Sequence, residues 1–253
     1  MRIDDRQRPA VAKLPSPAKR GFASGVSWVA DGFRYFRQAP FVWMVMTVIV
    51  VLTTALLSLV PLVFLLTFPL SILFAGGMML GCAAIDRGEP LRVSHLFAGF
   101  QTHTGALVGL GGLYLAASVL VMLLMAGVVA SFPLPAFDKV LMAAPGTLLP
   151  SQLQALMVWV VVVNLLAMLL LTPVVMAVWF APALIVLQGL DAVTAARLSL
   201  KACLVNWRPF LLYGVLAMAL LLLAMLLFGL GLLVAVPVLA ASVYAGWKDV
   251  FQP

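Results

Sequence analysis

The fold is decided by one stretch, QAPFVWMVMTVIVVLTTALLSLVPLVFLLTFPLSILFAGGMMLGCAAI, which covers residues 38–85. Its 48 residues contain no Asp, Glu, Lys, Arg or His, and the charged residues Arg37 and Asp86 flank it. A helix needs about 20 apolar residues to cross the core of a bilayer, so this stretch is long enough to cross twice. Both of its ends then lie on the same side of the membrane.

The rest of the chain has the composition of a helical membrane protein. Of its 253 residues, 65% are hydrophobic and 9% are charged, whereas soluble domains carry about 25% charged residues. Apolar runs such as 165–171 and 220–227 do not alternate as the strands of an outer-membrane barrel do. Backbone groups in lipid must be satisfied within the segment, so we expect these runs to be helices. The predicted class is an all-α polytopic membrane protein.

Six membrane-spanning helices are predicted, arranged as three hairpins. They cover about residues 41–60, 64–85, 106–129, 152–181, 210–228 and 233–247. A basic tail over residues 1–23, rich in Arg, Lys, Pro and Ala, precedes them and is expected to be disordered. Residues 24–253 are therefore expected to form a single transmembrane helical domain.

An amphipathic segment precedes each hairpin, at residues 24–38, 95–103 and 191–207. We expect these segments to be helices that lie on the membrane surface, with Ser94 capping the second and Asp191 the third. In the first segment, the apolar face is formed at helical spacing by Val26, Val29, Gly32, Phe33 and Phe36. Trp28 and Tyr35 fall at the border of that face, where interfacial aromatic residues are common.

The basic residues predict the orientation of the chain. Fourteen of the 15 Lys and Arg residues lie on the side of the two termini, and only Lys139 lies on the opposite side. Because Lys and Arg are enriched in cytoplasmic loops, both termini and all three amphipathic segments are expected to be cytoplasmic, in a bacterial inner membrane. The basic residues lie beside the spans rather than in an aromatic-rich soluble module, so nucleic acid is not an expected partner.

Two glycine pairs and one proline are the structural features predicted within the spans. Gly77 and Gly81, like Gly105 and Gly109, are four residues apart, a spacing that lets helices approach closely. Pro173 is expected to kink or interrupt the fourth span, because proline removes a helical hydrogen bond, and Pro182 is expected to end it. A continuous helix over residues 152–181 would be roughly 45 Å long, longer than the ~30 Å bilayer core.

No predicted span contains Asp, Glu, Lys, Arg or His, so the sequence offers no catalytic group or metal ligand at membrane depth. We therefore expect no enzymatic activity and no cofactor. The first functional hypothesis is engagement of anionic phospholipid, or of a membrane partner, by Arg34, Arg37, Arg197 and Lys201 on the amphipathic segments. The alternative is a permease or channel component for a neutral or amphiphilic small solute, with its path beside an interrupted fourth span.

Three short motifs carry a resemblance to a known family. They are WVADGFRYFRQAP at 28–40, RGEP at 87–90 and LFAGF at 96–100. Over about residues 22–250 the chain resembles a betaproteobacterial-type family of six-helix inner-membrane proteins of unknown function. Its layout is also similar to the membrane domain attached to some glycerophosphodiester phosphodiesterases. The resemblance implies six spans and an inner-membrane location, and it brings no catalytic motif with it.

Overall fold

The computed structural model describes residues 16–131, 150–226 and 228–252, and within these ranges the chain contains helices and turns but no strand. The α-helices are α1 (Ser24–Gln38), α2 (Pro40–Ser58), α3 (Thr67–Asp86), α4 (Thr104–Ser131), α6 (Pro150–Trp179), α7 (Ala181–Gln188), α8 (Ala192–Val205), α9 (Trp207–Leu226) and α10 (Leu232–Phe251). Two short 3-10 helices, η2 (Val63–Leu66) and η3 (Val93–Phe100), precede α3 and α4. The all-α class is confirmed.

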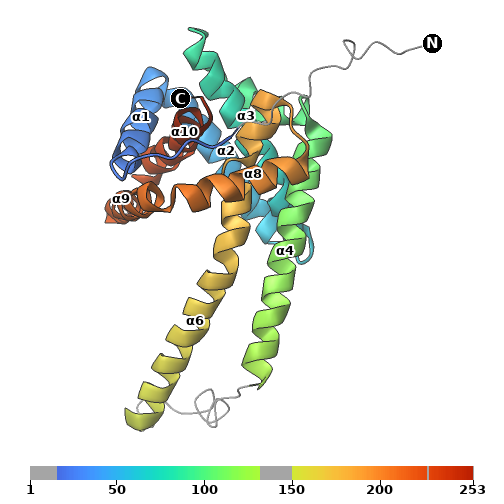
Figure 1. The fold of residues 1–253 in the computed structure, drawn as a ribbon, viewed down its shortest axis with the longest axis vertical. Coiled ribbons are helices and arrows are strands. Elements are labelled where there is room, and N and C mark those ends of the chain that lie inside the picture. Colours follow the sequence, from blue (N-terminus) through green and yellow to red (C-terminus); the bar gives the residue numbers. More distant parts are fainter. Residues whose placement is uncertain (1–15, 132–149, 227, 253) are drawn as a thin grey trace, which may run out of the picture.

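Six helical segments of the described chain are long and apolar enough to cross a membrane, as predicted. They are α2, η2 with α3, α4, α6 with α7, α9 and α10. The sixth helix continues beyond the predicted boundary at residue 247 and carries Lys248 and Asp249 in its last turn. In Figure 1, α4 and α6 run side by side away from the other helices. Their surfaces are almost entirely apolar and exposed, which is stable only in lipid.

The core lies at the end of the molecule where α1, α3, α7, α8 and α10 meet (Figure 1). Its largest fully buried side chains include Trp43, Trp247, Tyr35 and Phe180. The three amphipathic segments all belong to this end, and each is packed against a membrane-spanning helix. The sequence predicted that these segments lie on the membrane surface, and it did not predict their packing against the spanning helices.

The apolar face of α1 was predicted only in part: Gly32 and Phe36 are buried as expected, and Val29 packs against the core. Gly25, Trp28, Gly32 and Tyr35 are buried against α9 and α10, whereas Val26 and Phe33 remain 49% and 42% exposed. The buried residues follow one another at intervals of three and four, the spacing of a helix–helix contact. A Cβ on Gly25 would lie 2.5 Å from the Pro209 carbonyl oxygen, so glycine is what allows this close approach. Trp28 and Tyr35 are therefore core residues rather than interfacial ones.

The second amphipathic segment is also different from the prediction. Its helix, η3, is a 3-10 helix that begins at Val93, so Ser94 lies inside it and does not cap it. Instead the His95 side chain accepts a hydrogen bond at Nδ1 from the Arg92 backbone N–H, at 3.0 Å. The helix lies along α3, with Leu96 completely buried.

The basic tail is ordered from at least Ala18, although disorder was expected as far as residue 23. The Ala18 N–H donates to the carbonyl of Val250 at 2.9 Å. The buried Asn206 side chain accepts from the Arg20 N–H at 2.7 Å and donates to the Ala18 carbonyl at 3.0 Å. One side-chain amide thus forms hydrogen bonds with two backbone groups of the tail, an N–H and a carbonyl. Residues 1–15 lie outside the described residues.

The fourth span continues through Pro173 and is interrupted at Phe180, seven residues later. The Ser199 hydroxyl of α8 is inserted at the break: it accepts from the Phe180 N–H at 2.9 Å and donates to the Met176 carbonyl at 2.6 Å. These two groups would bond directly in a continuous helix. Pro182 lies in the first turn of α7, where a missing N–H costs little. The interruption therefore depends on Ser199 and Pro182.

Candidate functional site

Polar side chains converge on Asp86, at the end of α3. The Tyr35 hydroxyl donates to Asp86 Oδ1 at 2.7 Å, and the Tyr244 hydroxyl donates to Oδ2 at 2.9 Å. Lys248 Nζ lies 2.6 Å from the same Oδ2. Burial, together with the hydrogen bond to Asp86, raises the pKa of Tyr35, so its hydroxyl stays protonated and donates. This cluster joins α1, α3 and α10.

Asp249 forms a second junction, five residues beyond Tyr244 on α10. Trp28 Nε1 donates to Asp249 Oδ2 at 3.0 Å, and Arg20 Nε lies 3.1 Å from Oδ1. The guanidinium of Arg20 also donates to the backbone carbonyl of Asp249. The tail, α1 and α10 are therefore held together by charged hydrogen bonds in addition to apolar packing.

The four predicted lipid-binding residues are all exposed, but they differ in their neighbours. Arg34 forms an ion pair with Asp31 at 3.3 Å, and Arg37 lies over the Phe33 ring, 5.9 Å from its centroid. Arg197 and Lys201 have no ion-pair partner within the described residues. They lie on α8, while α1 carries the other pair.

The predicted glycine pairs lie in different surroundings. A Cβ on Gly77 would clash with the Leu96 backbone of η3, and one on Gly81 would lie 2.8 Å from Leu91 Cδ1. The close approach is therefore to the segment 91–100, whereas a neighbouring span was expected. A Cβ on Gly105 would meet no atom within 4 Å, and one on Gly109 would meet Ala192 Cβ at an ordinary 3.6 Å. The expected contact face of the second pair is not observed.

Small residues do mediate a contact between α3 and α4, but at a different position. A Cβ on Gly111 would lie 2.7 Å from Pro69 Cβ and still closer to its Cα. Gly111 is buried, whereas its neighbour Gly112 is exposed. The glycine-rich sequence of 105–112 thus indicated a contact, and only burial distinguishes the residue that makes it.

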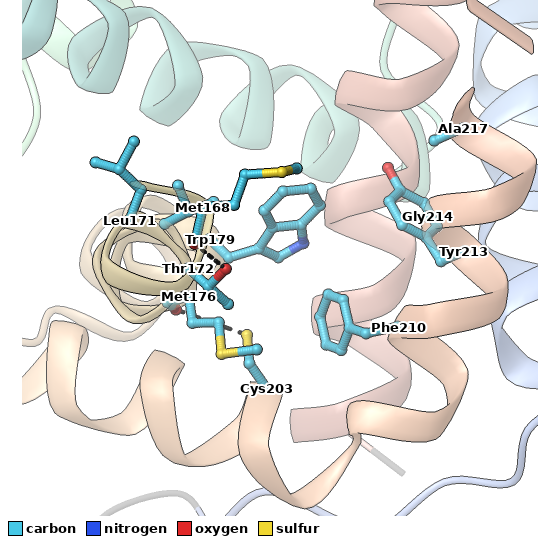
Figure 2. A pocket seen from close by; sticks show the side chains of 11 residues that line it. Met168, Leu171, Thr172, Met176, Trp179, Cys203, Phe210, Tyr213, Gly214 and Ala217 are labelled. Atoms are coloured by element: carbon cyan, nitrogen blue, oxygen red, sulfur yellow. Dashed lines mark hydrogen bonds between the residues drawn. The ribbon is translucent and has the colours of Figure 1, made fainter. Parts of the chain in front are cut away.

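An apolar cavity of about 420 Å³ lies between α6, α8 and α9. Figure 2 shows Trp179 projecting from α6 toward Phe210 and Tyr213 of α9, with Cys203 of α8 at one end. Burial raises the pKa of Cys203 to about 12, so its thiol stays protonated and unreactive. Among the described residues, no group of three or more His, Cys, Asp or Glu side chains is placed to hold a metal.

The sequence did not identify Asp86, Asp249 or Asn206 as organising residues. Asp86 was recognised only as the charge that ends a span, and Asp249 only as a charge near the C-terminus. Their partners are separated from them by 51 to 229 residues, so no local pattern joins them. An acidic residue at a span end, together with tyrosine or tryptophan on an adjoining amphipathic helix, is the available signal.

Comparison with known proteins now identifies the family. A protein of Burkholderia thailandensis described as a probable inner membrane protein is 31% identical over 232 residues, which is 88% of this chain and 81% of that relative. No family model matches the chain. No solved structure matches it. The chain belongs to the family of this betaproteobacterial protein, and with its six apolar helices it is a multi-pass inner-membrane protein.

Proposed function

We propose that the protein is a non-catalytic inner-membrane protein whose basic face engages anionic phospholipid headgroups in the cytoplasmic leaflet. The residues involved are Arg34 and Arg37 on α1, and Arg197 and Lys201 on α8. Both termini would lie on the cytoplasmic side with them, as the distribution of Lys and Arg indicates.

The observation that carries this proposal is that the acidic residues are already bound to other groups of the protein. Every carboxylate in the described part of the chain has a partner within the protein: Asp31, Asp86, Glu89, Asp191 and Asp249. Arg197 and Lys201 remain exposed without an acidic partner there. The charge left for an external partner on this face is therefore positive, and the nearest abundant anions are phospholipid headgroups.

The expected attraction is modest for each residue and useful in sum. A basic residue near an anionic leaflet contributes about 1 kcal/mol, and salt reduces this contribution because the screening length is about 8 Å at physiological ionic strength. Arg34 already interacts with Asp31 at 3.3 Å, so it should contribute less than Arg197 or Lys201.

The test compares three variants purified from the same membranes. We expect Arg197→Gln/Lys201→Gln to lower the retained phosphatidylglycerol and cardiolipin, relative to phosphatidylethanolamine, more than Arg34→Gln/Arg37→Gln does. The control is Arg87→Gln/Glu89→Gln, which removes an exposed ion pair of 2.7 Å without changing the net charge. If the α8 variant keeps the lipid composition of the control, its charges do not select lipid and the proposal fails.

A further inference from the structure

The cavity between α6, α8 and α9 has the properties of a binding site for a lipid chain. Its walls are apolar and aromatic, formed mainly by Met168, Met176, Trp179, Phe210, Tyr213 and Ala217. In Figure 2 the residues of α6 and those of α9 face one another across it. Both helices span the membrane, and their outer surfaces are exposed apolar side chains. The cavity therefore opens toward lipid.

Three polar side chains of the lining already have partners within the protein. The Thr172 hydroxyl donates to the Met168 carbonyl at 2.6 Å, and the Tyr213 hydroxyl lies 2.8 Å from Ser242 Oγ. The Cys203 thiol is directed to the Met176 carbonyl at 3.6 Å. A ligand with several polar groups would lose its bonds to water here without replacement, which is unfavourable. The walls thus suit a hydrocarbon chain.

One donor in the lining is different. Within the described residues the indole N–H of Trp179 has no hydrogen-bond partner, and Trp179 lies at the end of α6 next to α8. A tryptophan ring is apolar while its N–H needs an acceptor, which is why tryptophan is common where lipid chains meet polar groups. The ester carbonyl of a phospholipid would supply that acceptor at the end of a chain lying in the cavity.

The length of the cavity matches one leaflet. Its lining extends along α6 from Met168 to Trp179, which is about 16 Å at 1.5 Å per residue. Half of the ~30 Å hydrocarbon core is about 15 Å. A chain that enters beside α8 would therefore reach the middle of the bilayer, and the cavity would not provide a path across both leaflets.

We propose that this cavity holds one acyl chain of an anionic phospholipid from the leaflet on the α8 side. The inference rests on the proposed function for the identity of the headgroup. Arg197 and Lys201 are exposed on α8, Arg208 is exposed at the start of α9, and Cys203 and Phe210 of the same two helices line the cavity. The two helices that line the cavity with Cys203 and Phe210 thus also carry exposed basic residues without an acidic partner among the described residues, a combination that suits an anionic phospholipid.

Gly214 offers a position from which the cavity can be filled. Gly214 lines it, and a Cβ at this position would meet nothing within 4 Å. We expect Gly214→Phe to place its ring where the chain would lie. Gly112→Phe on α4 is the matched control, because Gly112 is also exposed and open but does not line the cavity.

The experiment uses full-length protein in phosphatidylethanolamine vesicles that contain phosphatidylglycerol with a photoreactive diazirine in one acyl chain. In the unaltered protein, cross-links should map to α6 and α9 around Met176, Phe210 and Ala217. Gly214→Phe should lower this cross-linking about tenfold, equivalent to about 1.4 kcal/mol, while Gly112→Phe leaves it unchanged. Equal labelling of both variants, or cross-links spread evenly over the spans of the unaltered protein, would overturn the inference.

Charge and cavity variants separate the two proposals. If Arg197→Gln/Lys201→Gln leaves the lipid preference unchanged while Gly214→Phe still abolishes the mapped cross-links, the cavity binds a chain but the headgroup proposal fails. If the charge variant alters the preference and Gly214→Phe has no effect, headgroup engagement stands and the cavity proposal fails. The positions of the cross-links in the unaltered protein test the cavity proposal even if Gly214→Phe does not fold.

Discussion

Replacement of Asp86 by alanine should weaken the packing of α1 against α3 and α10, because Asp86 connects these three helices. Asp86 accepts hydrogen bonds from Tyr35 and Tyr244, whose side chains are only 2% and 4% exposed, and it is paired with Lys248. The alanine variant leaves both hydroxyl groups without this acceptor and Lys248 without its counter-charge.

These contacts set the magnitude of the effect. A hydrogen bond to a charged group contributes about 1.5–3 kcal/mol, and two such bonds are lost. The Asp86 side chain is 27% exposed, so water can replace part of what it provided and the low end of the range applies. The lysine is 46% exposed, and exposed ion pairs contribute about 0–1 kcal/mol. We therefore expect Asp86→Ala to lower the free energy of unfolding by about 3 kcal/mol.

The assay is reversible unfolding in mixed micelles, followed by tryptophan fluorescence, with a double-mutant cycle as the control. Tyr35→Phe removes one donor and should cost about 1.5 kcal/mol in the parent. In the Asp86→Ala background the same change should cost much less, because its acceptor is already absent. A cost for Asp86→Ala below about 0.5 kcal/mol, or the same cost for Tyr35→Phe in both backgrounds, would refute the reasoning.

The remaining predictions concern a close glycine contact, a helix cap and the topology. Gly77→Ala should destabilise the protein by about 1–3 kcal/mol in the same assay, because its methyl group would clash with the η3 backbone, whereas Gly105→Ala meets open space and should be tolerated. Asp191→Ala should speed amide exchange in the first turn of α8, because its carboxylate accepts from the N–H groups of Val193 and Thr194. The hydrogen bonds from Thr194 lower the pKa of Asp191. The cap is therefore fully formed above the ordinary carboxyl pKa and is lost as the pH falls through the lowered pKa of Asp191. Amide exchange that shows no dependence on pH, once the intrinsic pH dependence of exchange is subtracted, would contradict this. Topology reporters fused after residue 252 and at Asp138 should report cytoplasm and periplasm respectively, and the reverse result would contradict the orientation.

Hydrophobicity was sufficient to predict the number and approximate bounds of the spans, because a helix in lipid must be long and uncharged whatever surrounds it. Helix caps were less predictable. Asp191 caps α8 as expected, since an N-cap interacts only with residues two and three positions away. Ser94 does not cap η3, because that segment is shaped by its contact with α3. Tertiary contacts thus replaced the local rule in the second case.

The interruption of the fourth span shows where local reasoning stops. Pro173 was expected to kink or interrupt the helix, and Pro182 was expected to end it. The break occurs near Pro182 because Ser199, 19 residues beyond Phe180, supplies a hydroxyl that bonds both backbone groups left without a helical partner. Pro173 lacks such a partner in the described structure, and the helix continues past it. A proline marks a possible break, and a polar partner from another helix determines which one is used.

Polar contacts on the buried sides of α1 and α8 also fix the positions of the basic residues on these helices. Helix α1 is fixed by Tyr35 and Trp28, which donate to Asp86 and Asp249, and α8 is fixed by Ser199. These contacts use polar groups on the buried side of each helix. The basic residues on the opposite side are thereby held in place before any ligand arrives, so binding a headgroup would order only flexible side chains and not whole helices. Because Asp86 and Asp249 are paired within the protein, they hold these helices together and do not offset the exposed charges of Arg197 and Lys201.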